Sequence, residues 1–284
     1  MAPVKYRLID GPFLYRLCLE VASLAGLSDF KLDLNRLSGG AHRTIYYDAL
    51  PVRKNNQSAE EFLSAEIQKL EFLNRIRAFR AYQVRDGITR LKTKSSGSKM
   101  SQVLEQKGVD TWIAVDAVRL AFPGIADEIE ILTADSDLYP AFEAIQMTKA
   151  RGTLVFEQGR ATPELIYSAD FSNPISLNEV ISWIGNSRLI GATAATSSTK
   201  PNHSGAKSIS IGELTFEVAN DSTGILMNKI ISGKYYQTLR ATNILSAVDW
   251  INERNVHTPW KEVCRLLQST LSVSSNVDRP PTFT

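Results

Sequence analysis

The sequence has few residues suited to cross-linking or to soft metal sites. It contains only two cysteines and three histidines in 284 residues. Cys18 and Cys264 lie far apart in apolar segments, so neither a disulfide framework nor a zinc site built on cysteine pairs is expected. His42, His203 and His257 have no mutual spacing suited to a metal. We therefore expect a reducing, cytoplasmic setting.

Long apolar runs and a strong net charge are also missing. Arg16 and Glu20 interrupt the apolar stretches near the N-terminus, which does not suit a signal peptide. No other run approaches the roughly 18 apolar residues that a membrane helix needs, so no membrane partner is expected. The formal net charge is only +2, so bulk charge neither requires nor excludes a nucleic-acid partner.

Predicted strands and helices alternate over the first two-thirds of the chain. Apolar patterns predict strands at residues 4–9, 43–47, 128–133 and 153–156, and helices at 13–25, 59–79, 108–122 and 138–150. Such alternation is typical of a mostly parallel sheet with helices on both faces. The Asp86-Gly87 pair predicts a hairpin turn within residues 82–91, followed by a mobile Lys/Ser/Gly loop.

A segment rich in Ser, Thr, Ala, Gly and Asn, residues 193–208, is the predicted domain boundary. Residues 1–192 then form one domain, 209–271 a small α+β unit, and 272–284 a flexible tail. Just before the boundary, Ser176 and Glu179 predict a helix that starts with a capping box. The C-terminal unit is compatible with core extension, with a homo-oligomer or with another partner, and its charge favours none of them.

Several aspartates fall at predicted strand ends or helix starts, among them Asp10, Asp48, Asp110 and the Asp135–Asp137 pair. In a parallel α/β sheet these ends share the edge where ligands bind. Clustered carboxylates raise each other's pKa unless a cation is present, and Mg²⁺ or Mn²⁺ is the natural partner because hard cations prefer oxygen ligands. Taken singly, each aspartate is equally consistent with a loop or helix cap.

Four motifs in this order resemble the NYN-domain (LabA-like) proteins of the PIN-like nuclease superfamily. They are Leu8-Ile9-Asp10-Gly11, Tyr46-Tyr47-Asp48-Ala49-Leu50-Pro51, Lys107-Gly108-Val109-Asp110 with Asp116, and Leu132-Thr133-Ala134-Asp135-Ser136-Asp137. The match in order and spacing runs roughly from residue 4 to 184. The resemblance implies a Rossmann-like three-layer PIN/NYN fold with a central, mostly parallel sheet, and a Mg²⁺ or Mn²⁺ site that cleaves RNA.

The resemblance also implies roles for individual residues. The metal ligands would be Asp10, Asp110 and Asp135, with Asp137 as a further catalytic carboxylate and Asp48, Asp116 and Thr133 as second-tier candidates. One departure concerns Phe13, which stands where the family usually has Asn three residues after the first Asp. An apolar ring cannot supply the hydrogen bonds of an amide. A catalytically weak or inactive RNA-binding module is therefore the alternative.

A basic stretch lies between the second of these motifs and the third, and it ends at Lys107 of the third. Between residues 75 and 107 the chain carries nine Arg or Lys residues against only Asp86 and Glu105. With Phe79 and Tyr82 among them, such residues can follow a phosphodiester backbone and stack a base. The candidates for substrate binding are Arg90, Lys92, Lys94 and Lys107. Ordinary solvated surface charge is an equally good explanation of the stretch.

Two other enzyme classes are disfavoured. Haloacid-dehalogenase-like phosphatases also use Asp-x-Asp after an apolar strand, but Leu138-Tyr139 lacks the Thr or Val that usually follows, and the motif comes late in the domain. No Gly-x-Gly-x-x-Gly follows a predicted strand, which argues against a dinucleotide-dependent oxidoreductase. The sequence therefore predicts a metal-dependent endoribonuclease acting on single-stranded RNA.

Overall fold

The computed structural model describes residues 2–25, 27, 29–53, 57–96, 99–185, 192–195, 206–221, 224–231, 234–241, 243–252, 258–271 and 282–283. For residues 88–96 and 99–107 the description is limited to the strand pairing. The chain divides into two compact units. The first comprises residues 1–17, 31–175 and 283–284, and the second comprises 18–30 and 176–282.

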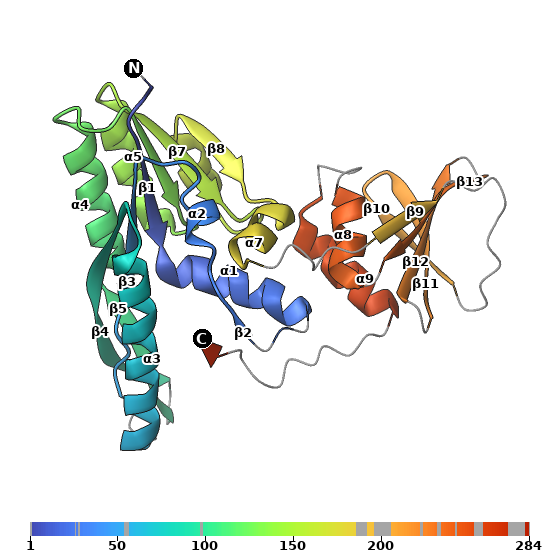
Figure 1. Ribbon diagram of the computed structural model, residues 1–284, viewed down its shortest axis with the longest axis horizontal. Coiled ribbons are helices and arrows are strands. Elements are labelled where there is room, and N and C mark those ends of the chain that lie inside the picture. Colours follow the sequence, from blue (N-terminus) through green and yellow to red (C-terminus); the bar gives the residue numbers. More distant parts are fainter. Residues whose placement is uncertain are drawn as a thin grey trace. The chain divides into compact units, whose positions relative to one another are not determined.

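A seven-stranded sheet forms the centre of the first unit (Figure 1). Its order is β5 (Lys99–Lys107), β4 (Tyr82–Ser96), β3 (Arg43–Ala49), β1 (Lys5–Asp10), β6 (Glu128–Leu132), β7 (Arg151–Phe156) and β8 (Phe171–Pro174). The strands from β4 to β8 are parallel, and β5 alone runs antiparallel to its neighbour. The predicted mostly parallel sheet is confirmed.

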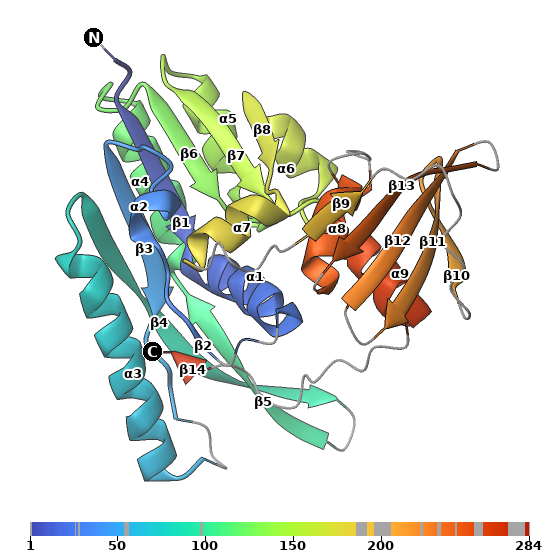
Figure 2. The same ribbon diagram turned by 45° about the vertical axis from the view of Figure 1, so that its right-hand side comes forward.

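Helices cover both faces of this sheet (Figure 2). One face carries α3 (Ala59–Ala78) and the start of α1 (Gly11–Leu24), and the other carries α4 (Val109–Ala121), α5 (Tyr139–Gln146) and α6 (Pro163–Ser168). The short α2 spans Leu34–Leu37, and a 3-10 turn, η1, spans Ser136–Leu138. The predicted three-layer α/β fold is therefore confirmed.

Burial explains why the strands lie in the middle of the layers. The last four residues of β1 and of β6 are all buried, as expected for central parallel strands covered on both faces. Leu8 and Ile131 pack in one core with Ile113 of α4 and Phe142 of α5. Opposite this face, α3 begins at Ser58, which forms a capping box with Glu61.

The predicted turn at Asp86-Gly87 is wrong. Strand β4 continues through both residues, pairing in parallel with β3 up to Gly87 opposite Ala49. From Ile88 onward it pairs antiparallel with β5, so most of the loop predicted over residues 92–101 is strand. Residues 97 and 98 lie outside the described residues. Pairing with the neighbouring strand outweighs the local preference of an Asp-Gly pair for a tight turn.

The second unit contains a five-stranded antiparallel sheet. Its order is β10 (Lys207–Ile211), β11 (Leu214–Asp221), β12 (Gly224–Ile231), β13 (Lys234–Ala241) and β9 (Ala192–Ala195). The helices α7 (Leu177–Trp183), α8 (Ile244–Asn252) and α9 (Trp260–Leu271) belong to the same unit, and β2 (Asp29–Phe30) and β14 (Thr282–Phe283) form a separate two-stranded sheet.

The structure divides the chain at a different place from the predicted linker. The second unit begins again at Ser176, where the expected capping box with Glu179 is present. The two ends of the 193–208 segment lie in β9 and β10, and residues 196–205 lie outside the described residues. Within the described part of the chain, no helix has both the length and the apolarity required to cross a membrane.

Candidate active site

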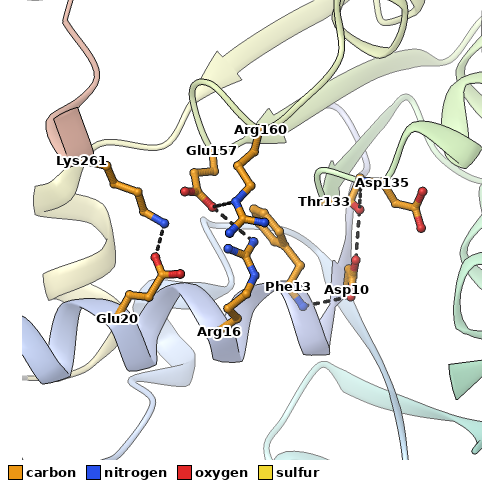
Figure 3. A network of polar contacts seen from close by, with 9 residues as sticks. All are labelled: Asp10, Phe13, Arg16, Glu20, Thr133, Asp135, Glu157, Arg160 and Lys261. Atoms are coloured by element: carbon orange, nitrogen blue, oxygen red, sulfur yellow. Dashed lines mark hydrogen bonds and ion pairs between the residues drawn. The ribbon is translucent and has the colours of Figure 1, made fainter. Parts of the chain in front are cut away.

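The carboxyl ends of the adjacent strands β1 and β6 bring residues from distant parts of the sequence together. Because Ile9 is paired with Leu132, the next residues, Asp10 and Thr133, leave the sheet side by side. The Thr133 hydroxyl donates to Asp10 Oδ2 at 3.1 Å, and its oxygen accepts the Asp135 backbone N–H at 3.1 Å (Figure 3). Thr133 therefore links the first carboxylate to the acidic motif after β6.

Glycine is required immediately after Asp10. A Cβ atom at Gly11 would lie 2.6 Å from the Tyr47 carbonyl oxygen and 2.7 Å from the Tyr46 ring. Only a residue without a side chain lets α1 begin directly at the end of β1. The backbone N–H of Phe13 then donates to Asp10 Oδ1 at 3.1 Å. Although Phe13 has no side-chain amide, its main chain contacts the carboxylate.

Asp110 approaches the same group of acids from α4. The helix starts after Gly108, which has a positive φ of 92°, and Asp110 lies in its first turn. The side chain is partly buried. Burial, followed by the charges of Asp135 and Asp137, raises its pKa. Asp110 is therefore within electrostatic range of the acids that follow β6.

Asp135 and Asp137 differ in their surroundings. Asp135 caps the turn η1, because its Oδ1 accepts the Asp137 backbone N–H at 2.9 Å. Asp137 is exposed. Among the described residues, no Lys or Arg forms an ion pair with Asp10, Asp110, Asp135 or Asp137. We call these four residues the carboxylate cluster.

The cluster is electrostatically unfavourable without a cation. The pKa of Asp10 is raised to about 6, mainly by burial and also by the charges of Asp110 and Asp135, while the hydrogen bonds from Phe13 and Thr133 act to lower it. Hard oxygen donors of this kind suit Mg²⁺ or Mn²⁺. As the side chains stand, however, no three His, Cys, Asp or Glu residues of the described part of the chain are placed to hold one ion together.

The second-tier aspartates already have cations of their own. Asp48 is completely buried, and Lys69 of α3 donates to its Oδ2 at 2.6 Å. Asp116 of α4 accepts the Tyr47 hydroxyl at 3.1 Å and Arg85 Nε at 3.0 Å. Each pair fastens a helix to the sheet. Their charge requires no metal ion.

The substrate-binding candidates Arg90, Lys92, Lys94 and Lys107 lie on β4 and β5. Their backbones pair in the antiparallel register of the two strands, Arg90 opposite Glu105 and Lys92 opposite Val103. Their side chains lie outside the described part of the structure.

The sequence did not lead us to a charged group at the end of β7. Glu157 directly follows this strand and is 1% exposed. Its Oε2 accepts from Arg16 Nη2 at 3.2 Å and lies 3.7 Å from Arg160 Nε (Figure 3). Arg16 also lies over the Phe13 ring, 5.5 Å from its centroid. Glu157 follows the carboxyl end of a strand, as Asp135 does, so the argument that identified Asp10 and Asp135 could also have identified Glu157.

Comparisons with known proteins found a family model and a solved structure that match this chain. The model of the NYN domain family matches residues 39–178. The match includes Asp110 and Asp135 and begins after Asp10. The chain is similar to a crystal structure of a protein of unknown function from Vibrio parahaemolyticus, with 17% identity and a TM-score of 0.41, over 62% of this chain and 95% of that one. A search of curated proteins found no match.

Proposed function

We propose that the protein is a Mg²⁺- or Mn²⁺-dependent ribonuclease, because the NYN domain family model matches residues 39–178 and NYN domains belong to the PIN-like nuclease superfamily. The substrate is single-stranded RNA, whose unstacked bases and backbone are accessible to a protein surface. The observation that carries this proposal is the carboxylate cluster, which has no described basic partner. Four acids at one sheet edge call for a cation.

The residues that would hold the ion are Asp10, Asp110 and Asp135, with Asp137 at the rim. A bound ion would supply an activated water and would stabilise charge on the scissile phosphate. Within the chain, Thr133 and the Phe13 N–H orient the two oxygens of Asp10. The Asp135 carboxylate is oriented in turn by the Asp137 N–H.

Proton release accompanies cation binding in this arrangement. The pKa of Asp10 is about 6, so a part of the molecules carries a protonated Asp10 below neutral pH. A ligand carboxyl group must lose its proton to bind a metal. Activity is therefore expected to rise with pH through the region around pH 6.

The test is cleavage of a labelled single-stranded RNA in the presence of Mn²⁺ or of EDTA. Asp135→Asn should reduce the cleavage rate by about a hundredfold or more, because an amide is a poor metal ligand. The matched control is Glu128→Gln, which removes a carboxylate at the other end of β6. Cleavage by Asp135→Asn at the wild-type rate would place the site elsewhere.

An RNA-binding module without catalytic activity is the second candidate. Two observations favour it, namely Phe13 in the position of the usual Asn and the lack of three ready-placed metal ligands in the described part of the chain. The same experiment separates the two candidates. RNA binding without cleavage in every Mn²⁺-containing preparation would support the binding module.

A further inference from the structure

The edge of the sheet that carries the carboxylate cluster also carries a basic group. Strand β7 lies next to β6, with Leu132 opposite Val155. Glu157 follows β7 just as Thr133 follows β6, and it is buried. A buried carboxylate is costly unless charged or polar groups surround it. Two arginines of the described part of the chain approach it, and they come from different segments of the first unit.

Arg16 belongs to α1, and Arg160 follows β7 in the turn after Glu157. Both guanidinium groups approach the same oxygen, Glu157 Oε2, at 3.2 and 3.7 Å. These three side chains carry one negative and two positive charges. A guanidinium carries five N–H donors in a planar fork, and the side chain of Arg160 is 51% exposed. Such forks match phosphate oxygens.

The two arginines lie close to the carboxylate cluster. Figure 3 shows Arg16 and Arg160 around Glu157, on the side of Phe13 away from Asp10. Along α1, Phe13 contacts Asp10 through its N–H and Arg16 through its ring. Helix α1 begins at Gly11, directly after Asp10, so Arg16 lies five residues, or about 7.5 Å along the helix axis, from the start of the helix. An RNA strand with one phosphate at the carboxylates would pass the arginines within about one to two nucleotides.

We propose that Arg160 and Arg16, oriented by Glu157, form a phosphate-binding subsite that holds RNA next to the bond to be cleaved. This inference rests on the proposed function and extends it to the recognition of the substrate. The ligand is a phosphate group, either an internal phosphodiester or a terminal phosphomonoester. The carboxylate cluster repels such a group, and the guanidinium pair offsets that repulsion.

The test measures the affinity of the full-length protein for RNA in EDTA, where cleavage does not contribute. Two fluorescent oligonucleotides of the same sequence are compared by anisotropy, one with a 5′-phosphate and one with a 5′-hydroxyl. Arg160→Gln should weaken binding by about tenfold, because it removes a charge-assisted hydrogen bond to phosphate. The slope of log K against log salt should fall in magnitude by about 0.7, the value for one phosphate contact on a single strand.

The control is Arg151→Gln. Arg151 is the first residue of β7 and is exposed at the opposite end of the strand that leads to Glu157. Arg151→Gln removes the same charge as Arg160→Gln, and the affinity of this variant for RNA should equal that of the wild type. An equal affinity of Arg160→Gln and Arg151→Gln for both oligonucleotides would overturn the proposal, whatever the outcome of the cleavage assay with Asp135→Asn.

A second variant separates orientation from net charge. Glu157→Gln makes the group more positive, so a purely electrostatic role predicts tighter binding. A positioning role predicts weaker binding, because the guanidinium groups lose the carboxylate that orients them. Tighter or unchanged binding by folded Glu157→Gln would remove Glu157 from the proposal.

The two oligonucleotides identify the phosphate. Equal losses for both in Arg160→Gln indicate an internal phosphodiester. A loss confined to the 5′-phosphorylated oligonucleotide indicates a terminal phosphomonoester. Both results support the subsite, since each shows a phosphate bound by the side chain of Arg160.

Discussion

Replacement of Asp10 by asparagine should stabilise the metal-free protein at neutral pH. The carboxyl group is buried between β1 and β6 and lies near two further acids, so its ionised form is disfavoured in the folded state. Its pKa rises from 3.8 to about 6. A group whose folded-state pKa is raised in this way lowers the stability as the pH rises from about 4 to about 6, because the folded protein holds the proton longer than the unfolded chain.

The magnitude follows from the size of this change. The difference between 3.8 and about 6 corresponds to about 3 kcal/mol of free energy of unfolding at neutral pH. Asparagine keeps an oxygen that accepts from the Phe13 N–H. Its NH2 group, which is a donor, takes the place of the oxygen that accepts from the Thr133 hydroxyl. Allowing about 1 kcal/mol for that altered hydrogen bond, Asp10→Asn should be about 2 kcal/mol more stable than the wild type.

The measurement is urea-induced unfolding in EDTA at about pH 4.5 and pH 7.5, with hydrogen exchange of β1 amides assigning the transition to the first unit. The gain should be present at the higher pH and absent at the lower. Mn²⁺ should stabilise the wild type and leave Asp10→Asn unchanged. The control Glu128→Gln, at the other end of β6, should show no such pH-dependent gain.

Two results would refute this reasoning. If Asp10→Asn is no more stable than the wild type at pH 7.5, the burial and the neighbouring acids do not disfavour the ionised Asp10. If the gain is as large at pH 4.5, its cause is packing and not charge.

Two further predictions concern the sheet that supports the cluster. Lys69→Met should lower the free energy of unfolding by about 3–5 kcal/mol, since Asp48 would remain as a buried charge without its ammonium partner. Chemical denaturation measures this loss. In the double variant Lys69→Met, Asp48→Leu, the second change should restore much of it. Gly11→Ala should greatly reduce the yield of folded protein, because its Cβ would lie 2.6 Å from the Tyr47 carbonyl oxygen; a well-folded Gly11→Ala protein by circular dichroism would contradict this geometry.

The order of strands and helices was predictable because it depends on local apolar patterns. In the runs leading to Asp10 and Asp135, apolar residues alternate with charged ones such as Arg7 and Glu130 before two apolar residues in a row, and both runs became central strands. The course of β4 was not predictable. Asp86-Gly87 favours a turn by its own conformational preference, and only pairing with β3, more than 30 residues earlier, keeps the strand extended.

The site was predictable to the extent that strand ends meet at one edge of a parallel sheet. The partners of the aspartates were not predictable, because a carboxylate's counter-charge depends on packing. Lys69 is 21 residues from Asp48, and Arg85 is 31 residues from Asp116. Glu157 was accessible to the strand-end argument, but its two arginines are separated in the sequence and become neighbours only in the folded protein.

The contact between Thr133 and Asp10 joins residues that are 123 positions apart. The first strand of the chain therefore waits for one of its two partners until β6 has been made. At about 5–20 residues per second, ribosomal synthesis of that interval takes roughly 6–25 s. Parallel pairing over such a separation is also slow to form because a long loop must close first. During synthesis, Asp10 is therefore present for many seconds before Thr133 and the acids that follow β6, and the carboxylate cluster forms late in folding.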